Sequence, residues 1–331
     1  MTHDFQPRRR QVLQGLLWGA ALSLTGSTPW VGRLPARLGG SFLQPWRADL
    51  SLPRTAWADR IALARRLGCP HIILQWTRHG ADYALTEALV LDLLDLCHAA
   101  GCALTVGLPY DPRYWAVLEG KTALGRAAFL TGVEQDCAQW RATAPYASHP
   151  AFRGWYIPYE LDQFSWQTPE QIALITDFLS RLMTHFAPSP VAISTFHSGV
   201  PGPGSLAGLW EAILDKVTIR PMVQDGVGVF GMANYRQLQP LFAALRARGT
   251  AFDVVVELFA QHANEHLEAP FTAEAAPAVR VQAQLAAAGA TGADSLLAFA
   301  LVPYMMSAAP HTTAAEAPGA AALRRAYAAG L

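Results

Sequence analysis

Short apolar runs alternate with longer amphipathic segments from about residue 36 to the end of the chain. The runs are rich in β-branched and aromatic residues, as buried strands are. The segments between them repeat apolar positions with helical spacing, and Thr168-Pro169-Glu170 is a typical helix start. Strands are predicted at residues 40–46, 71–76, 103–108, 152–160, 191–196, 219–225, 253–257 and 295–301. Helices are predicted at residues 57–67, 86–100, 124–140, 169–186, 206–217, 235–248, 273–288 and within 313–329.

This strict alternation predicts a single (β/α)8 barrel over residues 36–331. Parallel strands need helical crossovers, and eight of them close a sheet. A doubly wound open sheet is the alternative. No linker rich in Pro, Gly or Ser divides the chain into two domains.

Residues 1–35 are predicted to be an export signal and a short linker. Arg8-Arg9-Arg10-Gln11-Val12-Leu13, followed by the apolar run 16–24, resembles a bacterial twin-arginine signal. We therefore expect the twin-arginine machinery as a partner during export, and a periplasmic or secreted mature protein without a stable membrane span. A short basic, amphipathic anchor that stays attached is the alternative reading.

The charge of the chain is balanced, with 25 Lys and Arg against 25 Asp and Glu in 331 residues. This balance argues against a nucleic-acid-binding protein. Four cysteines, at positions 69, 97, 102 and 137, form no C-x-x-C pair or metal-ligand spacing. We expect buried free thiols, with one disulfide as the alternative.

Two predicted strands end in a glutamate. Glu160 closes the run Gly154-Trp155-Tyr156-Ile157-Pro158-Tyr159, and Glu257 closes Asp253-Val254-Val255-Val256. In a barrel both would lie at the mouth formed by the carboxyl ends of the strands. A carboxylate that ends a buried apolar run needs a partner or a function. Paired carboxylates suit glycosidic bond cleavage, with Glu160 as general acid/base and Glu257 as nucleophile or second carboxylate, and this chemistry needs no cofactor.

Asp225 is a third catalytic candidate, in the run Gln224-Asp225-Gly226-Val227-Gly228 after the sixth predicted strand. Three readings stay open: a substrate-binding carboxylate, the base of an inverting mechanism, or a cap of its own turn. The glycines would let the backbone approach a ligand closely.

The predicted strand ends are also rich in aromatic and amide side chains. Sugars present apolar faces for rings and hydroxyls for amides and carboxylates, so this composition predicts a glycan as the ligand. The candidate substrate-binding residues are Gln44, Trp46, Gln75, Trp76, Tyr110, Asp111, Tyr114, Trp115, Tyr159, Asp162, Trp166, His197, Gln224, Phe259 and Tyr304. Packing of the barrel top is the alternative for each ring. Asp111 can instead form a turn, and Asp162 can cap one or orient Glu160.

Three motifs together resemble a bacterial family of barrel proteins presumed to be glycosyl hydrolases, the domain of unknown function DUF4434. They are Gly154 to Asp162, Tyr110-Asp111-Pro112-Arg113-Tyr114-Trp115, and Gln224 to Gly228. The resemblance covers most of the chain beyond residue 38 and implies a (β/α)8 fold and a glycosidase activity. The chain has Tyr159 before Glu160, where the better-studied retaining glycosidases carry an asparagine.

Two other functions stay open. A barrel that binds glycan without cleaving it, as an accessory to exopolysaccharide production, would use the same aromatic residues. A zinc hydrolase is the more remote alternative, because His262-Ala263-Asn264-Glu265-His266 matches H-x-x-E-H. That signature requires a long helix, whereas these residues follow a strand and precede Pro270. No metal ligand is therefore predicted.

Overall fold

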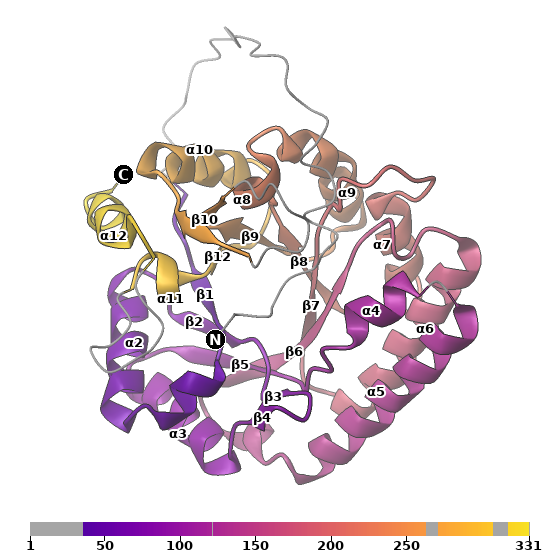
Figure 1. The fold of residues 1–331 in the computed structure, drawn as a ribbon, viewed down its shortest axis with the longest axis horizontal. Helices are drawn as coiled ribbons and strands as arrows, with labels where there is room; N and C mark the ends of the chain where they lie inside the picture. The colour runs from indigo at the N-terminus through magenta and orange to yellow at the C-terminus, as the bar shows by residue number, and fades with distance from the viewer. Residues whose placement is uncertain (1–35, 121, 263–270, 307–316, 331) are drawn as a thin grey trace, which may run out of the picture.

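Eight parallel strands close into a barrel in the order β1-β12-β9-β8-β7-β6-β5-β2 (Figure 1). The computed structural model describes residues 36–120, 122–262, 271–306 and 317–330. The barrel strands are β1 (Gly40–Leu43), β2 (His71–Leu74), β5 (Ala103–Gly107), β6 (Phe152–Leu161), β7 (Val191–Thr195), β8 (Arg220–Gln224), β9 (Asp253–Glu257) and β12 (Ser295–Phe299). The predicted (β/α)8 barrel is confirmed, and each predicted strand overlaps an observed one.

Helices surround the barrel, because each parallel crossover must return the chain outside the sheet (Figure 1). α6 shows how the sequence sets a boundary: Thr168 and Gln171 form a capping box and Pro169 occupies its first turn. The longer helices are α2 (Arg54–Arg66), α3 (Glu87–Ala99), α5 (Ala123–Thr143), α6 (Pro169–Phe186), α7 (Leu206–Leu214), α9 (Asn234–Arg248), α10 (Ala278–Gly289) and α12 (Ala320–Ala328). Shorter ones are η1 (Arg47–Ser51), α4 (Tyr114–Glu119), η2 (Tyr146–Ser148), α8 (Val227–Phe230) and α11 (Leu301–Tyr304).

The prediction of a helix from residue 273 was wrong at its start. Residues Ala273–Ala275 form β11, which pairs antiparallel with β10 (Phe259–Gln261), and α10 begins only at Ala278. Pairing with β10 satisfies the backbone hydrogen-bonding groups of these residues, and it outweighs the good helix propensity of alanine. A second hairpin, β3 (Arg78–His79) with β4 (Tyr83–Ala84), follows β2.

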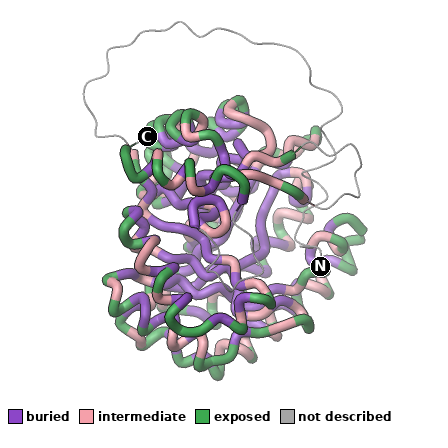
Figure 2. The backbone as a smooth tube through the Cα atoms, turned by 60° about the vertical axis from the view of Figure 1, so that its left-hand side comes forward, coloured by how far each residue is buried: buried purple, intermediate pink, exposed green. Residues whose placement is uncertain are grey.

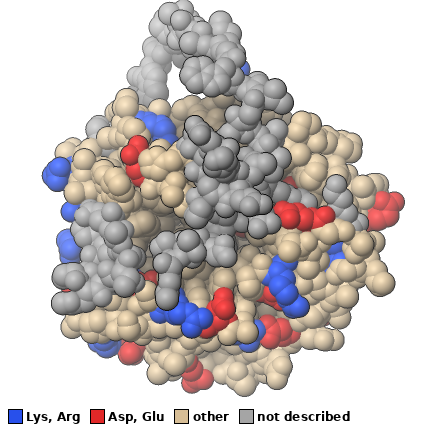
Figure 3. Space-filling model, viewed as in Figure 1, with Lys and Arg blue, Asp and Glu red and all other residues tan. Residues whose placement is uncertain are grey.

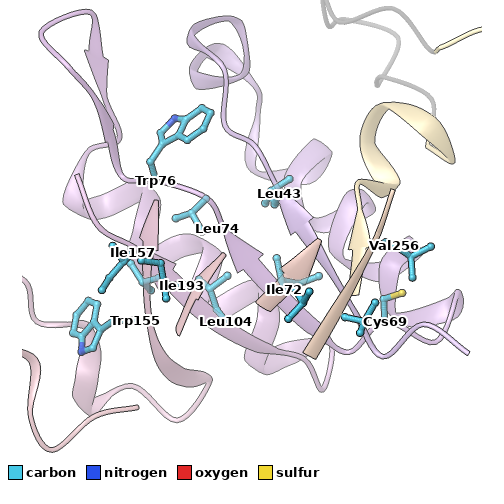
Figure 4. Close-up of a cluster of buried hydrophobic side chains, with 14 of the residues drawn as sticks. Leu43, Cys69, Ile72, Leu74, Trp76, Leu104, Trp155, Ile157, Ile193 and Val256 are labelled. Atoms are coloured by element: carbon cyan, nitrogen blue, oxygen red, sulfur yellow. The ribbon is translucent and has the colours of Figure 1, made fainter. Parts of the chain in front are cut away.

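The core has two parts. Inside the barrel, a cluster joins side chains from facing strands, namely Phe42, Ile73, Tyr156, Ala192, Met222, Val255, Leu297 and Ala300. A larger cluster lies between the strands and the helices and includes Leu74, Leu104, Ile157 and Ile193 (Figure 4). Figure 2 shows the strands buried and the exposed residues on the outer helices and loops. A strand residue of the first cluster therefore points into the barrel, and a strand residue of the second cluster points toward the helices.

Outside the core, charged residues of both signs are interspersed over the face seen in Figure 3. Within the described ranges, no helix combines the length and apolarity needed to span a membrane. The four cysteines are buried free thiols, and burial raises the pKa of Cys69 to about 12. The predicted export signal, residues 1–35, lies outside the described residues.

Ile73→Ala tests the interior cluster. Ile73 is fully buried inside the barrel, so truncation should lower the free energy of unfolding by about 2 to 5 kcal/mol. Leu124→Ala is the control, because Leu124 is 83% exposed and its loss should change stability by less than about 0.5 kcal/mol. Denaturant unfolding of both variants measures the difference, and equal losses would contradict this packing.

Candidate active site

Polar side chains form the inward-facing layer at the carboxyl ends of the barrel strands. Side chains alternate along a strand, so residues two positions beyond an interior residue also face inward. This count places Gln44 beyond Phe42, Gln75 beyond Ile73, Gln224 beyond Met222 and Glu257 beyond Val255. Glu160 lies four positions beyond Tyr156, on a strand whose register shifts between Ile157 and Leu161. The barrel thus brings three glutamines and two glutamates to one end.

Glu160 is held from β8 and from α4. The Nε2 of Gln224 donates a hydrogen bond of 2.6 Å to Oε1 of Glu160, and both residues are buried. The hydroxyl of Tyr114 donates to the backbone oxygen of Glu160 at 2.8 Å. Side chain and backbone are therefore both fixed, as an acid/base group requires.

Glu257 is held by the first turn of α8, which follows β8. The backbone N–H of Gly228 donates to its Oε2 at 2.9 Å, and the side chain of Glu257 is buried. A Cβ on residue 228 would lie 2.6 Å from the ring of Phe259 and 2.7 Å from its backbone oxygen. Glycine is needed there because the first turn of α8 passes close to β10, and this close approach brings the N–H to the carboxylate.

One segment therefore contacts both glutamates. Gln224 at the end of β8 binds Glu160, and Gly228 four residues later binds Glu257. Between them Gly226 has φ +63°, a backbone conformation that glycine adopts without strain. The sequence motif Gln224 to Gly228 is thus the structural link between the fourth and seventh barrel strands.

Asp225 points away from this inward layer. Because Gln224 faces inward, its neighbour faces α9 and α10, and Asp225 is fully buried there. Its carboxylate accepts hydrogen bonds from Gln284 Nε2 at 2.8 Å and from the backbone N–H of Val227 and Glu257. Burial, and next the charge of Glu257, raise the pKa of Asp225 to about 7. The bond from Val227 matches one of the three interpretations of Asp225, namely that it caps its own turn.

The predicted aromatic residues form a connected group beside β1, β2, β5 and β6. Trp76 contacts Trp46 edge to face at 5.5 Å between ring centres and stacks on Tyr110 at 5.9 Å. Tyr110 continues to Tyr159, which packs against Tyr114. These last three and Trp76 are buried, whereas Trp46 is partly exposed.

Other predicted aromatic residues lie on either side of this group. Trp115 is partly exposed and contacts Phe196 at 6.0 Å. Trp166 is fully buried, with the guanidinium of Arg126 5.7 Å from its ring centre. Phe259 and Tyr304 pack together at 5.6 Å beside β9 and β12 and are also buried. Of the four predicted tryptophans, Trp46 and Trp115 are therefore the two that keep part of their surface exposed.

Asp111 and Asp162 both stabilise turns. Asp111 accepts from the backbone N–H and the guanidinium of Arg113, and these bonds, against an opposing effect of burial, lower its pKa. Asp162 is fully buried and accepts from the backbone N–H of Phe164 and Ser165, each at 2.9 Å. This is the capping alternative for Asp162.

Gln75 is an unusual member of the inward layer. The residue is 1% exposed, and its Oε1 has no hydrogen-bond partner among the residues that the structure describes. A buried amide oxygen without a donor costs free energy, so the position suits a ligand or water that supplies an O–H. His197, by contrast, is half-buried, and its Nδ1 accepts from the N–H of Gly199. Burial lowers the pKa of His197.

The described part of the proposed zinc motif does not form a helix. His262 is exposed and directly follows β10, where its N–H donates to the backbone oxygen of Thr272. His266 lies outside the described residues. Among the residues that are described, no three His, Cys, Asp or Glu side chains group closely enough to hold a metal.

Sequence reasoning missed the residues behind Glu257, namely Tyr235, Arg280 and Gln284. Gln284 donates to the backbone oxygen of Glu257 as well as to Asp225. One signal was available, because Gln284 occupies the apolar face of α10 with Val281, Leu285 and Ala288. A buried amide on such a face needs polar partners.

Residues 38–314 match a protein family described as Domain of unknown function (DUF4434). The chain belongs to this family. It is also 27% identical over 267 residues to the uncharacterized protein YbcH of Escherichia coli K12, covering 78% of this chain and 87% of YbcH.

Solved structures of glycosidase-like barrels share the fold of this family member. One is a putative alpha-L-fucosidase from Bacteroides thetaiotaomicron, with a TM-score of 0.64, 16% identity, and coverage of 94% of this chain and 98% of that one. Another is the endo-1,4-beta-mannanase of Rhizomucor miehei, with a TM-score of 0.59, 12% identity, and coverage of 93% and 96%. At these identities the likeness concerns the fold.

The buried Asp225 predicts a pH dependence of stability. Its folded pKa of about 7 lies above the ordinary 3.8, so the folded protein binds more protons than the unfolded chain between these values. The contribution of Asp225 to stability is therefore present below about pH 4 and is lost as the pH rises through about 7. Asp225→Asn should show a smaller loss of unfolding free energy between pH 5 and pH 8 than the wild type. Denaturant titrations at both pH values test this, and an unchanged loss would contradict the assignment.

Proposed function

We propose that this protein is a glycoside hydrolase that cleaves oligosaccharides or polysaccharides with two carboxyl groups. The observation that carries the proposal is the placement of Glu160 and Glu257 at the inward-facing carboxyl ends of the fourth and seventh barrel strands, both bonded to one segment. The carboxyl ends of barrel strands are where enzymes of this fold keep their chemistry. The glycosidase-like structural neighbours support the same class.

In this proposal Glu160 is the general acid/base. The amide of Gln224 donates to Oε1 of Glu160 and holds the carboxyl group that supplies the proton for the leaving glycosidic oxygen. As the bond between that oxygen and the anomeric carbon breaks, the proton passes to the oxygen. In a retaining mechanism the Glu160 carboxylate then takes a proton from the water that completes hydrolysis, whereas in an inverting mechanism Glu257 takes the proton of the attacking water.

Glu257 is the second carboxylate. It either attacks the anomeric carbon directly or activates the attacking water, depending on its separation from Glu160. The Gly228 N–H holds one oxygen in place. The rings of Trp46 and Trp115 supply apolar surface for the sugar, and Gln75 supplies a buried acceptor for one of its hydroxyls.

Glu160→Gln separates cleavage from binding. The amide preserves the shape of the site but carries no transferable acidic proton, so release of new reducing ends from a polysaccharide panel should fall by about three orders of magnitude or more. Affinity for the cleaved glycan, measured by calorimetry, should persist. Glu211→Gln, on the exposed side of α7, is the matched control and should keep wild-type activity. A wild type that binds glycan but releases no reducing ends would favour the non-catalytic alternative.

Gln75→Leu tests whether Oε1 of Gln75 accepts a hydrogen bond from the glycan. The leucine removes the buried Oε1, which has no partner within the described part of the chain, so the free energy of unfolding should stay equal or rise. A hydroxyl that had bonded to Oε1 would lose its acceptor, and glycan affinity should fall about 5- to 30-fold, which corresponds to about 1 to 2 kcal/mol. Calorimetric binding measured beside denaturant unfolding separates the two effects. Unchanged affinity would remove Gln75 from the binding site.

A further inference from the structure

Asp225 lies behind Glu257, on the outer side of the barrel wall. It is enclosed by the end of β8, by Tyr235 of α9 and by Gln284 of α10. Its Oδ1 accepts the backbone N–H of Val227 at 3.1 Å and that of Glu257 itself at 3.2 Å. The Asp225 carboxylate therefore binds the backbone of Glu257, although the Glu257 side chain faces inward and Asp225 faces the helices.

The contacts of Asp225 identify which of its oxygens can carry a proton. Oδ1 is engaged by two backbone donors, so a proton belongs on Oδ2. Oδ2 accepts from Gln284 Nε2, and the orientation of that amide is fixed because its Oε1 accepts from Arg280 Nε at 3.1 Å. The remaining neighbour of Oδ2 is the hydroxyl of Tyr235, at 3.4 Å.

The Tyr235 hydroxyl has two acceptors for its single hydrogen. It lies 3.4 Å from Oδ2 of Asp225 and 3.2 Å from the backbone oxygen of Gln284. When Asp225 is ionised, Tyr235 can donate to Oδ2. When Asp225 is protonated, Oδ2–H can donate to the tyrosine oxygen, and the tyrosine hydrogen turns to Gln284. Both protonation states are thus satisfied without moving a heavy atom.

We propose that Asp225 is a positioning residue for Glu257. Its carboxyl group holds a proton on Oδ2, which donates a hydrogen bond to the Tyr235 hydroxyl oxygen. The carboxyl groups of Asp225 and Glu257 then carry a single negative charge, which is located on Glu257. The role rests on the proposed function, in which Glu257 must be ionised at the reacting centre. When the proton leaves for solvent at higher pH, the Tyr235 hydroxyl rotates to Oδ2 and the pair becomes doubly charged.

The surrounding charges are consistent with this arrangement. Glu257 faces Asp225 from β9, Arg280 faces the pair from α10, and Tyr235 and Tyr304 face it from α9 and α11. Burial and the charge of Glu257 together raise the pKa of Asp225, which agrees with a proton held there. Arg280 donates to the backbone oxygen of Glu257 at 3.1 Å.

Carboxyl titration by NMR tests the proposal without a substrate. Protein labelled with carbon-13 in the aspartate carboxyl groups would be titrated from pH 4 to pH 9, and Asp225→Asn would assign the signal. We expect Asp225 to titrate near pH 7. Glu257→Gln removes the neighbouring charge and should lower this pKa by about one unit or more, whereas Glu211→Gln on the exposed side of α7 should leave it unchanged.

Either of two results would overturn the proposal: an Asp225 signal that titrates below pH 5, or a shift in Glu257→Gln no larger than in Glu211→Gln. If the titration behaves as expected but no glycan is cleaved, the proposed function fails, whereas the protonated Asp225 beside an ionised Glu257 stands. If the protein proves to be a hydrolase, Asp225→Asn should also change the shape of its pH profile between pH 6 and pH 8. A residue that served the fold alone would lower activity equally at every pH.

Discussion

The hydrogen bonds that β8 and its loop make to Glu160 and Glu257 are the contacts on which the site depends. Two carboxylates buried at one end of a barrel are costly unless donors hold them. Gln224 supplies a side-chain donor to the first, and Gly228 supplies a backbone donor to the second. Because these donors lie four residues apart on one segment, the positions of the two glutamates are coupled.

The site is built in two layers. The inner layer contains the inward-facing glutamates and glutamines at the carboxyl ends of the strands. The outer layer contains Asp225, Tyr235, Arg280 and Gln284, packed between the barrel wall and α9 and α10. The outer layer fixes the backbone of Glu257, since Gln284 and Arg280 both donate to its carbonyl oxygen. The proposed chemistry belongs to the inner layer, and control of its charge belongs to the outer one.

The barrel could be predicted from sequence because its strands are short apolar runs with clear breaks between helical segments. Residues 273–275 could not, since their strand depends on pairing with β10, which local propensity does not report. The sequence also did not reveal that the Asp225 side chain points outward, toward the helices. Strands buried on both faces lack polar and apolar alternation, so only the interior cluster containing Met222 shows that Gln224 faces inward and Asp225 outward. The same limit hid the bond between Gln224 and Glu160, which joins strands 64 residues apart in sequence.

The central claim is that a glycan is cleaved between Glu160 and Glu257. The most direct measurement is a crystal structure of the Glu160→Gln variant with a bound oligosaccharide. We predict that the amide of residue 160 hydrogen-bonds the glycosidic oxygen and that Glu257 faces the anomeric carbon, with the two side chains about 5 to 5.5 Å apart for a retaining enzyme or about 6.5 to 9.5 Å apart for an inverting one. A glycan bound elsewhere on the barrel, or a gap well beyond this range, would contradict the account.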